Sequence, residues 1–162
     1  MTAAIRPLDP AREDEIDLVA RRMRQTLEEV LGEARGREVY SLDWLRDRVR
    51  FHLDPARSTG AVFLAERGGV VVGHTIVRVE QEAGDPGVFG LFSTTWVAPE
   101  ARRQGVANTL LERGEAWMRE RALPRAATYT STTNAPLIRL YEARSYRVGV
   151  RAEGMLELTR PL

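Results

Sequence analysis

The sequence predicts an α/β fold in which a mixed, mostly antiparallel central sheet is flanked by about four helices. Two kinds of segment predict it: four stretches carry apolar residues at helical spacing, and runs of β-branched and apolar residues of strand length lie between them. Neither a repeat nor a low-complexity tract nor a linker interrupts the 162 residues, so residues 1–162 are expected to form one domain.

The chain is expected to open with a short strand over residues 3–8, followed by a helix. Asp9 and Pro10 predict the start of this helix, because Asp caps helices and Pro fits their first turn. Apolar residues keep helical spacing to about residue 31, where Gly32 predicts the end, and Gly36 lies in the connection that follows. Ser41 opens a second helix, which runs to residue 53 and stops before Pro55.

A meander of three antiparallel strands is predicted next. Strands over residues 61–66 and 70–80 are joined by Gly68 and Gly69, which favour a tight hairpin turn, and residues 82–87 lead to a third strand over 88–97.

The last part of the chain alternates between helix and strand. The pattern predicts a helix from about residue 104 that ends before Pro124, a strand over 126–130, a helix over 134–144, and a closing hairpin of 146–151 with 155–159 around Gly154. A meander followed by alternating elements makes the sheet mixed.

Composition excludes several classes of protein. The 24 basic residues nearly balance the 23 acidic ones, so an arginine-rich nucleic-acid module is disfavoured. All the basic residues are Arg, which excludes a Walker phosphate loop and Schiff-base chemistry, and the absence of Cys excludes thiol nucleophiles and disulfides. Two distant His residues form no metal-ligand spacing, so no metal is expected. Neither a secretory leader nor a transmembrane stretch is evident, so a cytoplasmic location without membrane binding is expected.

The segment that follows the third meander strand has the features of a phosphate site. It runs from strand through a tight loop into a helix, whose first main-chain amides and positive dipole end attract anions. Small residues at Gly105 and Ala107 let an anion approach the backbone, and Arg102 and Arg103 supply charge. The alternative is an ordinary strand-to-helix turn with solvated arginines.

This loop resembles the pyrophosphate loop of the GNAT superfamily of acyl-CoA N-acyltransferases, whose pattern is Arg or Gln, two residues, Gly, one residue, then Gly or Ala. Arg102, Gly105 and Ala107 fill the pattern, while Arg103 stands where Gly is frequent. In the family, a bulge splays the preceding strand from its neighbour and the pantetheine arm pairs with that strand. The resemblance therefore implies a set of acetyl-CoA contacts: Trp96, Val97, Arg102, Arg103, Gln104, Gly105, Val106, Ala107, Asn108 and Asn134.

A second motif lies in the helix predicted over residues 134–144. Asn134 suits the helix N-cap, and Tyr141 shares an apolar face with Leu137 and Leu140, which by pattern alone fits a packed core Tyr. Asn followed seven positions later by Tyr is similar to the late GNAT motif, and this implies that Tyr141 protonates the leaving thiolate. The family's usual Gly and Phe at the following turn are replaced here by Ser145 and Tyr146.

No base is evident for the other half of the reaction. The strand before the loop carries no carboxylate, although Glu80 or Glu82 is expected opposite its early part, and Glu80 is the candidate base. The alternatives are His74 as base, or a water chain organised by Ser93, Thr95 and Thr130. His52, the other histidine, is expected to be packed or at the surface.

The acceptor is expected to be bound by the first two helices, their connection and the loop over residues 82–86. Acidic and aromatic residues occur there: Glu28, Glu29, Glu33, Tyr40 and Trp44. The resemblance implies an enzyme that moves an acetyl group from acetyl-CoA to a primary amine, small molecule or peptide, by direct attack in a ternary complex, with a homodimer as a further implication. The alternative is a non-catalytic acyl-CoA sensor or interaction module on the same fold.

Overall fold

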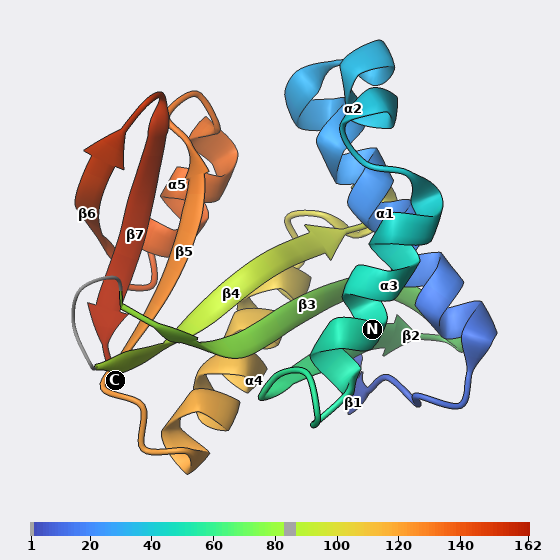
Figure 1. The fold of residues 1–162 in the computed structure, drawn as a ribbon, viewed down its shortest axis with the longest axis horizontal. Coiled ribbons are helices and arrows are strands. Elements are labelled where there is room, and N and C mark those ends of the chain that lie inside the picture. The colour runs from blue at the N-terminus through green and yellow to red at the C-terminus, as the bar shows by residue number, and fades with distance from the viewer. Residues whose placement is uncertain (1, 83–86) are drawn as a thin grey trace.

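The computed structural model describes residues 2–82 and 87–162 and has one seven-stranded sheet (Figure 1). The strands are β1 (Ala4–Pro7), β2 (Gly60–Arg67), β3 (Val70–Gln81), β4 (Val88–Val97), β5 (Arg125–Ser131), β6 (Arg147–Ala152) and β7 (Met155–Pro161). Their order across the sheet is β1-β2-β3-β4-β5-β7-β6, and only β4 and β5 pair in parallel. The predicted mixed, mostly antiparallel sheet is therefore confirmed.

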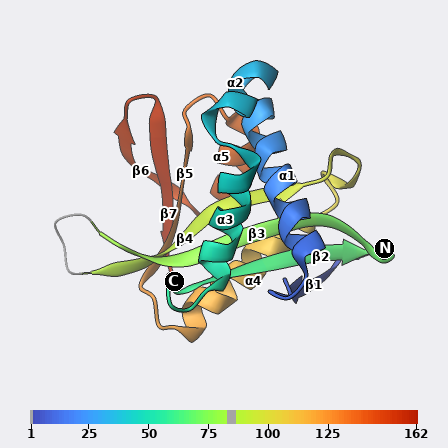
Figure 2. The same cartoon turned by 45° about the vertical axis from the view of Figure 1, so that its right-hand side comes forward.

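The described residues form five α-helices and one short 3₁₀ helix (Pro99–Ala101). The α-helices are α1 (Glu13–Leu31), α2 (Glu33–Val39), α3 (Leu42–Leu53), α4 (Val106–Glu120) and α5 (Ala135–Glu142). Helices α1 and α3 cover one face of the sheet and α4 lies on the other, as two views 45° apart show (Figures 1 and 2). We call these the α1 face and the α4 face.

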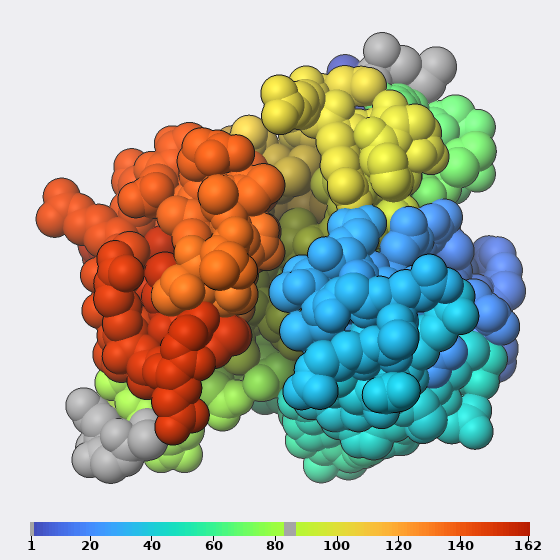
Figure 3. Space-filling model, turned by 90° about the horizontal axis from the view of Figure 1, so that it is seen from above, coloured from blue at the N-terminus to red at the C-terminus, as the bar shows by residue number. Residues whose placement is uncertain are grey.

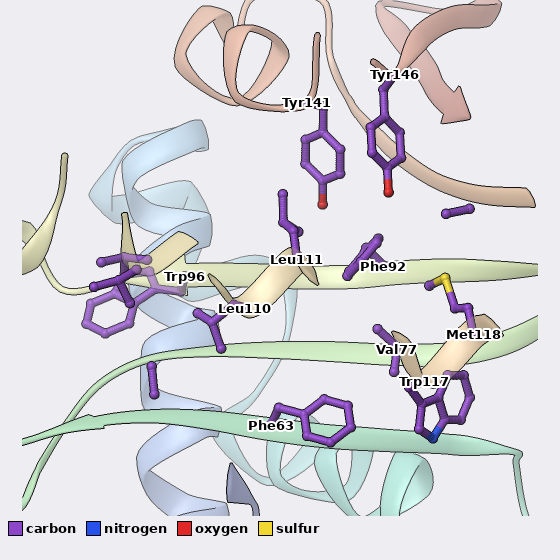
Figure 4. Packing of buried hydrophobic residues seen from close by; sticks show 14 of the residues in the cluster. Phe63, Val77, Phe92, Trp96, Leu110, Leu111, Trp117, Met118, Tyr141 and Tyr146 are labelled. Atoms are coloured by element: carbon purple, nitrogen blue, oxygen red, sulfur yellow. The ribbon is translucent and has the colours of Figure 1, made fainter. Parts of the chain in front are cut away.

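Each covered face has its own hydrophobic core. On the α1 face, residues such as Ile16 and Val49 pack against Leu64 and Ile76 of the sheet. On the α4 face the cluster is larger and includes Tyr141 from α5, which places α5 on the same side as α4 (Figure 4). The α1-face helices cover β2, β3 and part of β4, whereas β5, β7 and β6 carry no helix on that face (Figure 1).

Two expectations about the first helices are wrong. Helix α1 begins at Glu13, not at Asp9, because the Asp9 carboxylate accepts a hydrogen bond from the amide of Ala11 and closes a tight turn before the helix. The connection expected around Gly36 is the short helix α2. Its turn packs so closely on α1 that a Cβ at Gly36 would lie 2.5 Å from the Cα of Glu28, so the glycine serves packing here.

Other boundaries follow the sequence closely. Ser41 caps α3 by accepting a hydrogen bond from the amide of Trp44 at 3.0 Å, and Gly32 ends α1 with φ at +90°. The hairpin turn at Gly68 and Gly69 has both residues at positive φ, which only glycine adopts freely.

Helix α4 lies unusually close to the centre of the sheet. A Cβ at Gly114 would lie 2.3 Å from a ring carbon of Phe92, and one at Gly90 would lie 2.4 Å from the sulfur of Met118. Glycine on each side of this interface therefore brings the helix against the middle of β4. The start of α4 is thereby fixed next to the end of the same strand.

Strands β4 and β5 are paired at one end and separate at the other. Gly90 pairs with Ala126 and Phe92 with Thr128, and no pairing between the two strands is described beyond these residues. Figure 1 shows β4 running away from β5 toward the loop that precedes α4. The separation leaves one edge of β4 open inside the sheet.

Candidate active site

The open edge begins at a β-bulge. Phe92 pairs with Val77 and Thr94 with Ile76, so Ser93 is the extra residue on β4. This confirms the expectation that a bulge splays β4 from its neighbour. The surface is hollowed between the orange-red segments β5–β7 and α5 and the blue-cyan segments α1–α3 (Figure 3). We call this hollow the groove.

Main-chain groups of β4 point into the separation. The amide of Ala98 donates to the carbonyl of Val72 at 2.8 Å, so this position faces β3. Main-chain N–H and C=O groups alternate in direction along an antiparallel strand. The main-chain groups of Trp96 therefore also face β3, and the main-chain groups of Val97 and Thr95 face β5.

Of the two expected contacts for the pantetheine arm, Val97 is therefore the one whose main chain faces the separation. Its amide is open there, whereas its carbonyl accepts from Arg102 Nε at 2.8 Å. Sequence reasoning did not single out Thr95 for this role.

The side chain of Trp96 packs away from the separation. Its indole is 4% exposed, and the Arg22 guanidinium of α1 lies 4.4 Å from the ring centre. The ring of His74 stacks at 6.3 Å on the same side. Trp96 thus anchors α1 to β4, and its side chain faces α1.

The loop between β4 and α4 uses left-handed backbone at two positions. Arg103 has φ at +62° and Gly105 at +84°. The value at Arg103 explains why the family often has Gly there, since a residue with Cβ is strained in this conformation. A Cβ at Gly105 would meet nothing within 4 Å, so the backbone there borders open space.

The first turn of α4 is uncapped. Gly105 is its N-cap and no side chain accepts a hydrogen bond from the helix. The amides of Val106, Ala107 and Asn108 have no acceptor within a helix that starts there, and Asn108 is exposed. Val106 itself is 4% exposed and packs in the core, so its side chain fixes the helix while its amide stays available.

The polar side chains of the loop have defined partners. Arg102 donates through Nε to the carbonyl of Val97 at 2.8 Å and pairs with Glu29 of α1 at 3.2 Å. Gln104 donates to the carbonyl of Glu100 at 3.2 Å and accepts a hydrogen bond from Arg67. Arg102 therefore holds the end of β4 against α1.

Two arginines beside this loop have no carboxylate partner among the residues that the structure describes. Arg103 is exposed, and Arg67, at the end of β2, contacts Gln104 only. Sequence reasoning missed Arg67, because nothing in the pattern of a hairpin end relates it to a loop 37 residues later.

Tyr141 of α5 points its hydroxyl toward β4 (Figure 4). Its ring makes edge-to-face contacts with Phe92 at 6.0 Å and with Tyr146 at 4.9 Å, and the residue is 1% exposed. Burial raises the pKa of the Tyr141 hydroxyl above its usual range, against hydrogen bonding with Thr95 and Thr128. The group is therefore a protonated donor next to the strand separation.

Asn134 caps α5, as expected. Its side-chain oxygen accepts a hydrogen bond from the amide of Leu137 at 3.4 Å, and its side chain is partly buried. This bond orients the helix that carries Tyr141. The expected contact between Asn134 and acetyl-CoA stays a prediction.

The turn after α5 accommodates its unusual residues. Ser145 has φ at +72°, the conformation for which the family uses Gly. Tyr146 fills the aromatic position and is 2% exposed, and its hydroxyl donates to Glu115 of α4 at 2.6 Å. Glu115 also pairs with Arg144. This buried network ties α4 to the corner beside Tyr141.

The candidate base Glu80 lies on the α1 face. It pairs in register with Phe89, as the sequence indicates, and its carboxylate accepts from Arg78 Nε at 3.0 Å. Glu82 accepts from Arg125 Nε at 2.8 Å. Of the loop expected to help bind the acceptor, residues 83–86 lie outside the described residues.

The three residues considered for a water chain differ in their surroundings. Ser93 is exposed at the bulge, and Thr130 is 6% exposed on β5. The Thr95 hydroxyl lies 2.8 Å from that of Thr75. Of the three, only Thr95 interacts with the Tyr141 hydroxyl.

Both histidines are buried on the α1 face. Burial lowers the pKa of His74 to about 3, helped by the charge of Arg22, and burial lowers the pKa of His52 to about 4. His52 Nε2 lies 3.0 Å from Arg78 Nη1 and accepts its hydrogen bond. A base needs a pKa near the working pH, so neither ring is suited to accept the amine proton. Within residues 2–82 and 87–162, no three His, Cys, Asp or Glu side chains are grouped so as to hold a metal ion.

The residues expected to form an acceptor rim are partly engaged elsewhere. Glu28 pairs with Arg37 at 3.3 Å and Glu33 with the same arginine at 2.8 Å, while Glu29 holds Arg102. Tyr40 and Trp44 stack at 4.0 Å and remain about 40% exposed. The aromatic pair is thus available to a ligand, and the acidic residues mainly join α1, α2 and the loop.

Sequence reasoning missed two residues on the α1 face of β5 and β7. Tyr129 is the first β5 residue beyond the last pairing with β4, and it is 49% exposed. Its hydroxyl donates to Glu157 of β7 at 3.2 Å, and Glu157 is 8% exposed. The one available signal was a charged residue between two buried leucines, Leu156 and Leu158.

The fold, the open edge of β4 and the uncapped helix after it define the class of acyl-CoA-dependent transferases. The model of the Acetyltransferase (GNAT) family matches residues 20–146, so the chain belongs to this family. The predicted membership of the GNAT acyltransferase superfamily is thereby confirmed.

Curated relatives are named for one activity. The chain is 33% identical over 103 residues to a mycothiol acetyltransferase from Thermobispora bispora, covering 63% of this chain and 35% of the relative. It is 35% identical over 95 residues to one from Acidothermus cellulolyticus, covering 52% and 29%. The chain therefore spans about a third of the length of the curated relatives it matches.

Solved structures share the whole fold at low sequence identity. The PaiA N-acetyltransferase from Thermoplasma acidophilum, in complex with coenzyme A, superposes with a TM-score of 0.79 at 15% identity over 100% of both chains. The NatC complex bound to Gag peptide and CoA gives 0.78 at 19% identity, over 100% of this chain and 99% of that one. These likenesses confirm the fold.

Of the residues that the structure describes, none belongs to a helix that is both long and apolar enough to cross a membrane.

Proposed function

We propose that the chain transfers an acetyl group from acetyl-CoA to a primary amine by direct attack in a ternary complex. One observation carries the proposal: the open edge of β4 leads from the Tyr141 hydroxyl to the uncapped start of α4. A substrate with a thioester at one end and a diphosphate further along needs these features in this order.

The loop fits a diphosphate by its main chain. The amides at residues 106–108 have no helical acceptor, and the empty space where a Cβ of Gly105 would stand lets a bulky anion approach. Arg103 and Arg67 would add charge-assisted bonds, while Arg102 positions the loop through Val97 and Glu29. The amide of Val97 and the main-chain groups of Thr95 would pair with the pantetheine arm, while the Val97 carbonyl is held by Arg102.

The reaction then needs two groups at the thioester. The amine attacks the carbonyl carbon, the C–N bond forms and the C–S bond breaks. The thiolate takes the proton of the Tyr141 hydroxyl, and Tyr141 regains a proton from the acylated nitrogen. A main-chain amide of β4 at the separation would stabilise the developing oxyanion. The chain has no Cys, so an acyl-thiol enzyme is excluded and sequential kinetics are expected.

Tyr141→Phe tests the proposal most directly. Acetyl-CoA binding is measured by calorimetry, and thiol release is followed with a panel of primary amines that includes the acceptor of the mycothiol acetyltransferase reaction. We expect kcat to fall roughly 100-fold or more, with the Kd for acetyl-CoA within about twofold, because only the acid is lost. An equal loss of binding and turnover would mean that Tyr141 is a packing residue.

The matched control is Tyr146→Phe, which removes a buried hydroxyl from the ring that packs edge-to-face on Tyr141. Its hydroxyl donates to Glu115 of α4, whereas that of Tyr141 interacts with Thr95 of β4, so this variant should lose stability but keep kcat within a few-fold. A loss of turnover as large as that of Tyr141→Phe would mean that packing of this corner, and not the acid, is being measured.

The calorimetric titration also separates the proposal from its alternative. Binding of acetyl-CoA by the wild type without turnover of any amine would favour the non-catalytic sensor.

The raised pKa of Tyr141 also predicts a pH profile. Because the hydroxyl stays protonated above its ordinary range, kcat shows no loss up to about pH 10 from ionisation of this group. A fall in kcat with a midpoint between pH 8 and 9 that Tyr141→Phe abolishes would contradict the assignment.

A further inference from the structure

Glu157 lies on the α1 face of the sheet, beside the point where β4 and β5 separate. Its neighbours Leu156 and Leu158 are buried in the core of the α4 face, so alternation along β7 turns Glu157 to the other side. It pairs with Tyr129, the β5 residue that follows the last contact with β4. No helix covers this part of the sheet among the described residues, and it borders the groove (Figure 3).

The Glu157 carboxylate is fixed by three features. Oε2 accepts hydrogen bonds from Arg125 and from the Tyr129 hydroxyl, both at 3.2 Å. A Cβ on Gly149 would lie 2.3 Å from Oε1. Gly149 belongs to a stretch of β6 whose register with β7 is shifted. A side chain at Gly149 would therefore displace the carboxylate, and glycine keeps its position free.

A purely structural role explains Glu157 poorly. Arg125 is already neutralised by Glu82, which it contacts through Nε and Nη2. Among the described residues, no hydrogen-bond donor reaches Oε1 of Glu157. Oε1 reaches the surface without a donor from residues 2–82 or 87–162, so a bound ammonium would donate to it there.

Charged groups of both signs surround Tyr129. Partial burial and the negative charges of Glu157 and Glu80 raise the pKa of the Tyr129 hydroxyl, and the positive charge of Arg125 lowers it. Glu80 is paired with Arg78 at 3.0 Å, so Glu157 is the carboxylate that keeps an oxygen for a ligand. The Tyr129 ring is half exposed, which offers an aromatic surface next to the negative charge.

We propose that Glu157, held by Arg125 and Tyr129, binds the ammonium group of the acceptor on the α1 face beside the strand separation. This inference rests on the proposed function and names the acceptor site. An alkylamine is a far stronger base than a carboxylate, so transfer of its proton to a carboxylate is strongly uphill. Glu157 therefore selects and orients a cationic acceptor, and the ammonium gives its proton to a solvent base, hydroxide or buffer, before the nitrogen attacks.

Glu157→Gln is the main test, because Gln keeps the shape of the side chain and can still accept from Tyr129. With the best acceptor among spermidine, tyramine, lysine and an alanine-terminated peptide, we expect the KM for the amine to rise at least tenfold. The Kd for acetyl-CoA and the slow hydrolysis of acetyl-CoA by water should stay within about twofold. A role in structure alone would change all three quantities or none.

Two further variants keep the test decisive. Tyr129→Phe removes one bond to Glu157 and should raise the amine KM several-fold in the same direction. Glu153→Gln makes the same charge change in the exposed turn of the same hairpin, and it should leave the amine KM unchanged. If Glu157→Gln does not fold, Tyr129→Phe alone decides between the two interpretations.

The outcomes separate this inference from the proposed function. Turnover by the wild type with an amine KM that neither Glu157→Gln nor Tyr129→Phe raises would overturn the inference and leave the proposed function standing. Absence of turnover with every amine, despite binding of acetyl-CoA, would overturn both. A KM increase in Glu153→Gln as large as that in Glu157→Gln would show a general charge effect and overturn the inference.

Discussion

The two sides of the strand separation are built in different ways. The loop side consists of residues 95–108 and the helix α5 that carries Tyr141, and the groups proposed to act there are mostly main-chain amides and one hydroxyl. The groove side consists of side chains from α3, β3, β5 and β7, among them Arg48, Glu80, Tyr129 and Glu157. In the proposed function, contiguous backbone binds acetyl-CoA and dispersed side chains bind the acceptor.

The largest effect that would sharpen this comparison is the pH dependence of the free energy of unfolding. It arises from two histidines buried on the helix-covered side of the groove. His52 and His74 are buried there with pKa values of about 4 and about 3. The unfolded chain binds protons at these sites below about pH 6.5 and the folded chain does not, so the free energy of unfolding falls as the pH falls. We expect a loss of about 2 kcal/mol for each histidine between pH 7.5 and pH 5.

Urea unfolding at the two pH values measures this loss. His74→Asn and His52→Gln serve as controls, because each should remove its own share of the pH dependence whatever it does to stability at pH 7.5. The paired carboxylates Asp14, Asp17 and Asp47 have lowered pKa values and hold their stabilising charge down to more acid conditions. A free energy of unfolding that is constant from pH 7.5 to pH 5 would contradict the burial of neutral histidines.

The same contrast explains what the sequence could predict. Every strand was predicted, because each run of apolar residues of strand length is bounded by Gly or Pro, and the loop with Gly105 was visible as a short contiguous pattern. Helix α2 was missed because Gly36 suggests a break, and only its contact with the Glu28 backbone makes glycine suitable inside that helix. Asp9 was misjudged because it is as well suited to a tight turn as to a helix cap.

The groove side depends on register, which the sequence does not display. Glu157 is one acidic residue among many until β7 is paired with β5, where it faces Tyr129. Tyr129 in turn gains meaning only because the pairing of β5 with β4 stops one residue before it. Trp96 shows the same limit on the loop side, since the direction of its main chain follows from the hydrogen bond between Ala98 and Val72.

A second prediction tests whether the loop side depends on the close approach of α4 to β4. Gly114→Ala places a Cβ within 2.3 Å of the Phe92 ring, so the helix must shift although Ala favours helix formation. We expect a net loss of about 1 to 3 kcal/mol in the free energy of unfolding, measured by urea titration. Glu112→Ala, on the exposed side of the same helix, should change it by less than about 0.5 kcal/mol. A more stable Gly114→Ala variant would show that the helix has room to move.

The smallest effect distinguishes backbone strain from ligand contact at the loop. Gly105 and Gly154 have nearly the same φ, +84° and +77°, and a Cβ at either residue meets nothing within 4 Å. Ala at either position should therefore cost about 1 kcal/mol of stability through the left-handed backbone alone. Gly154 lies in the turn between β6 and β7, whereas Gly105 borders the proposed diphosphate site.

Gly105→Ala should accordingly raise the Kd for acetyl-CoA about tenfold, and Gly154→Ala should leave it unchanged, as calorimetry would measure. Because both variants share the strain, their difference in Kd reports only what occupies the space beside residue 105. Equal Kd values at equal loss of stability would mean that no part of acetyl-CoA lies against that backbone. The loop side would then lose its main-chain cradle, and the two sides of the separation would no longer differ in the way they bind their ligands.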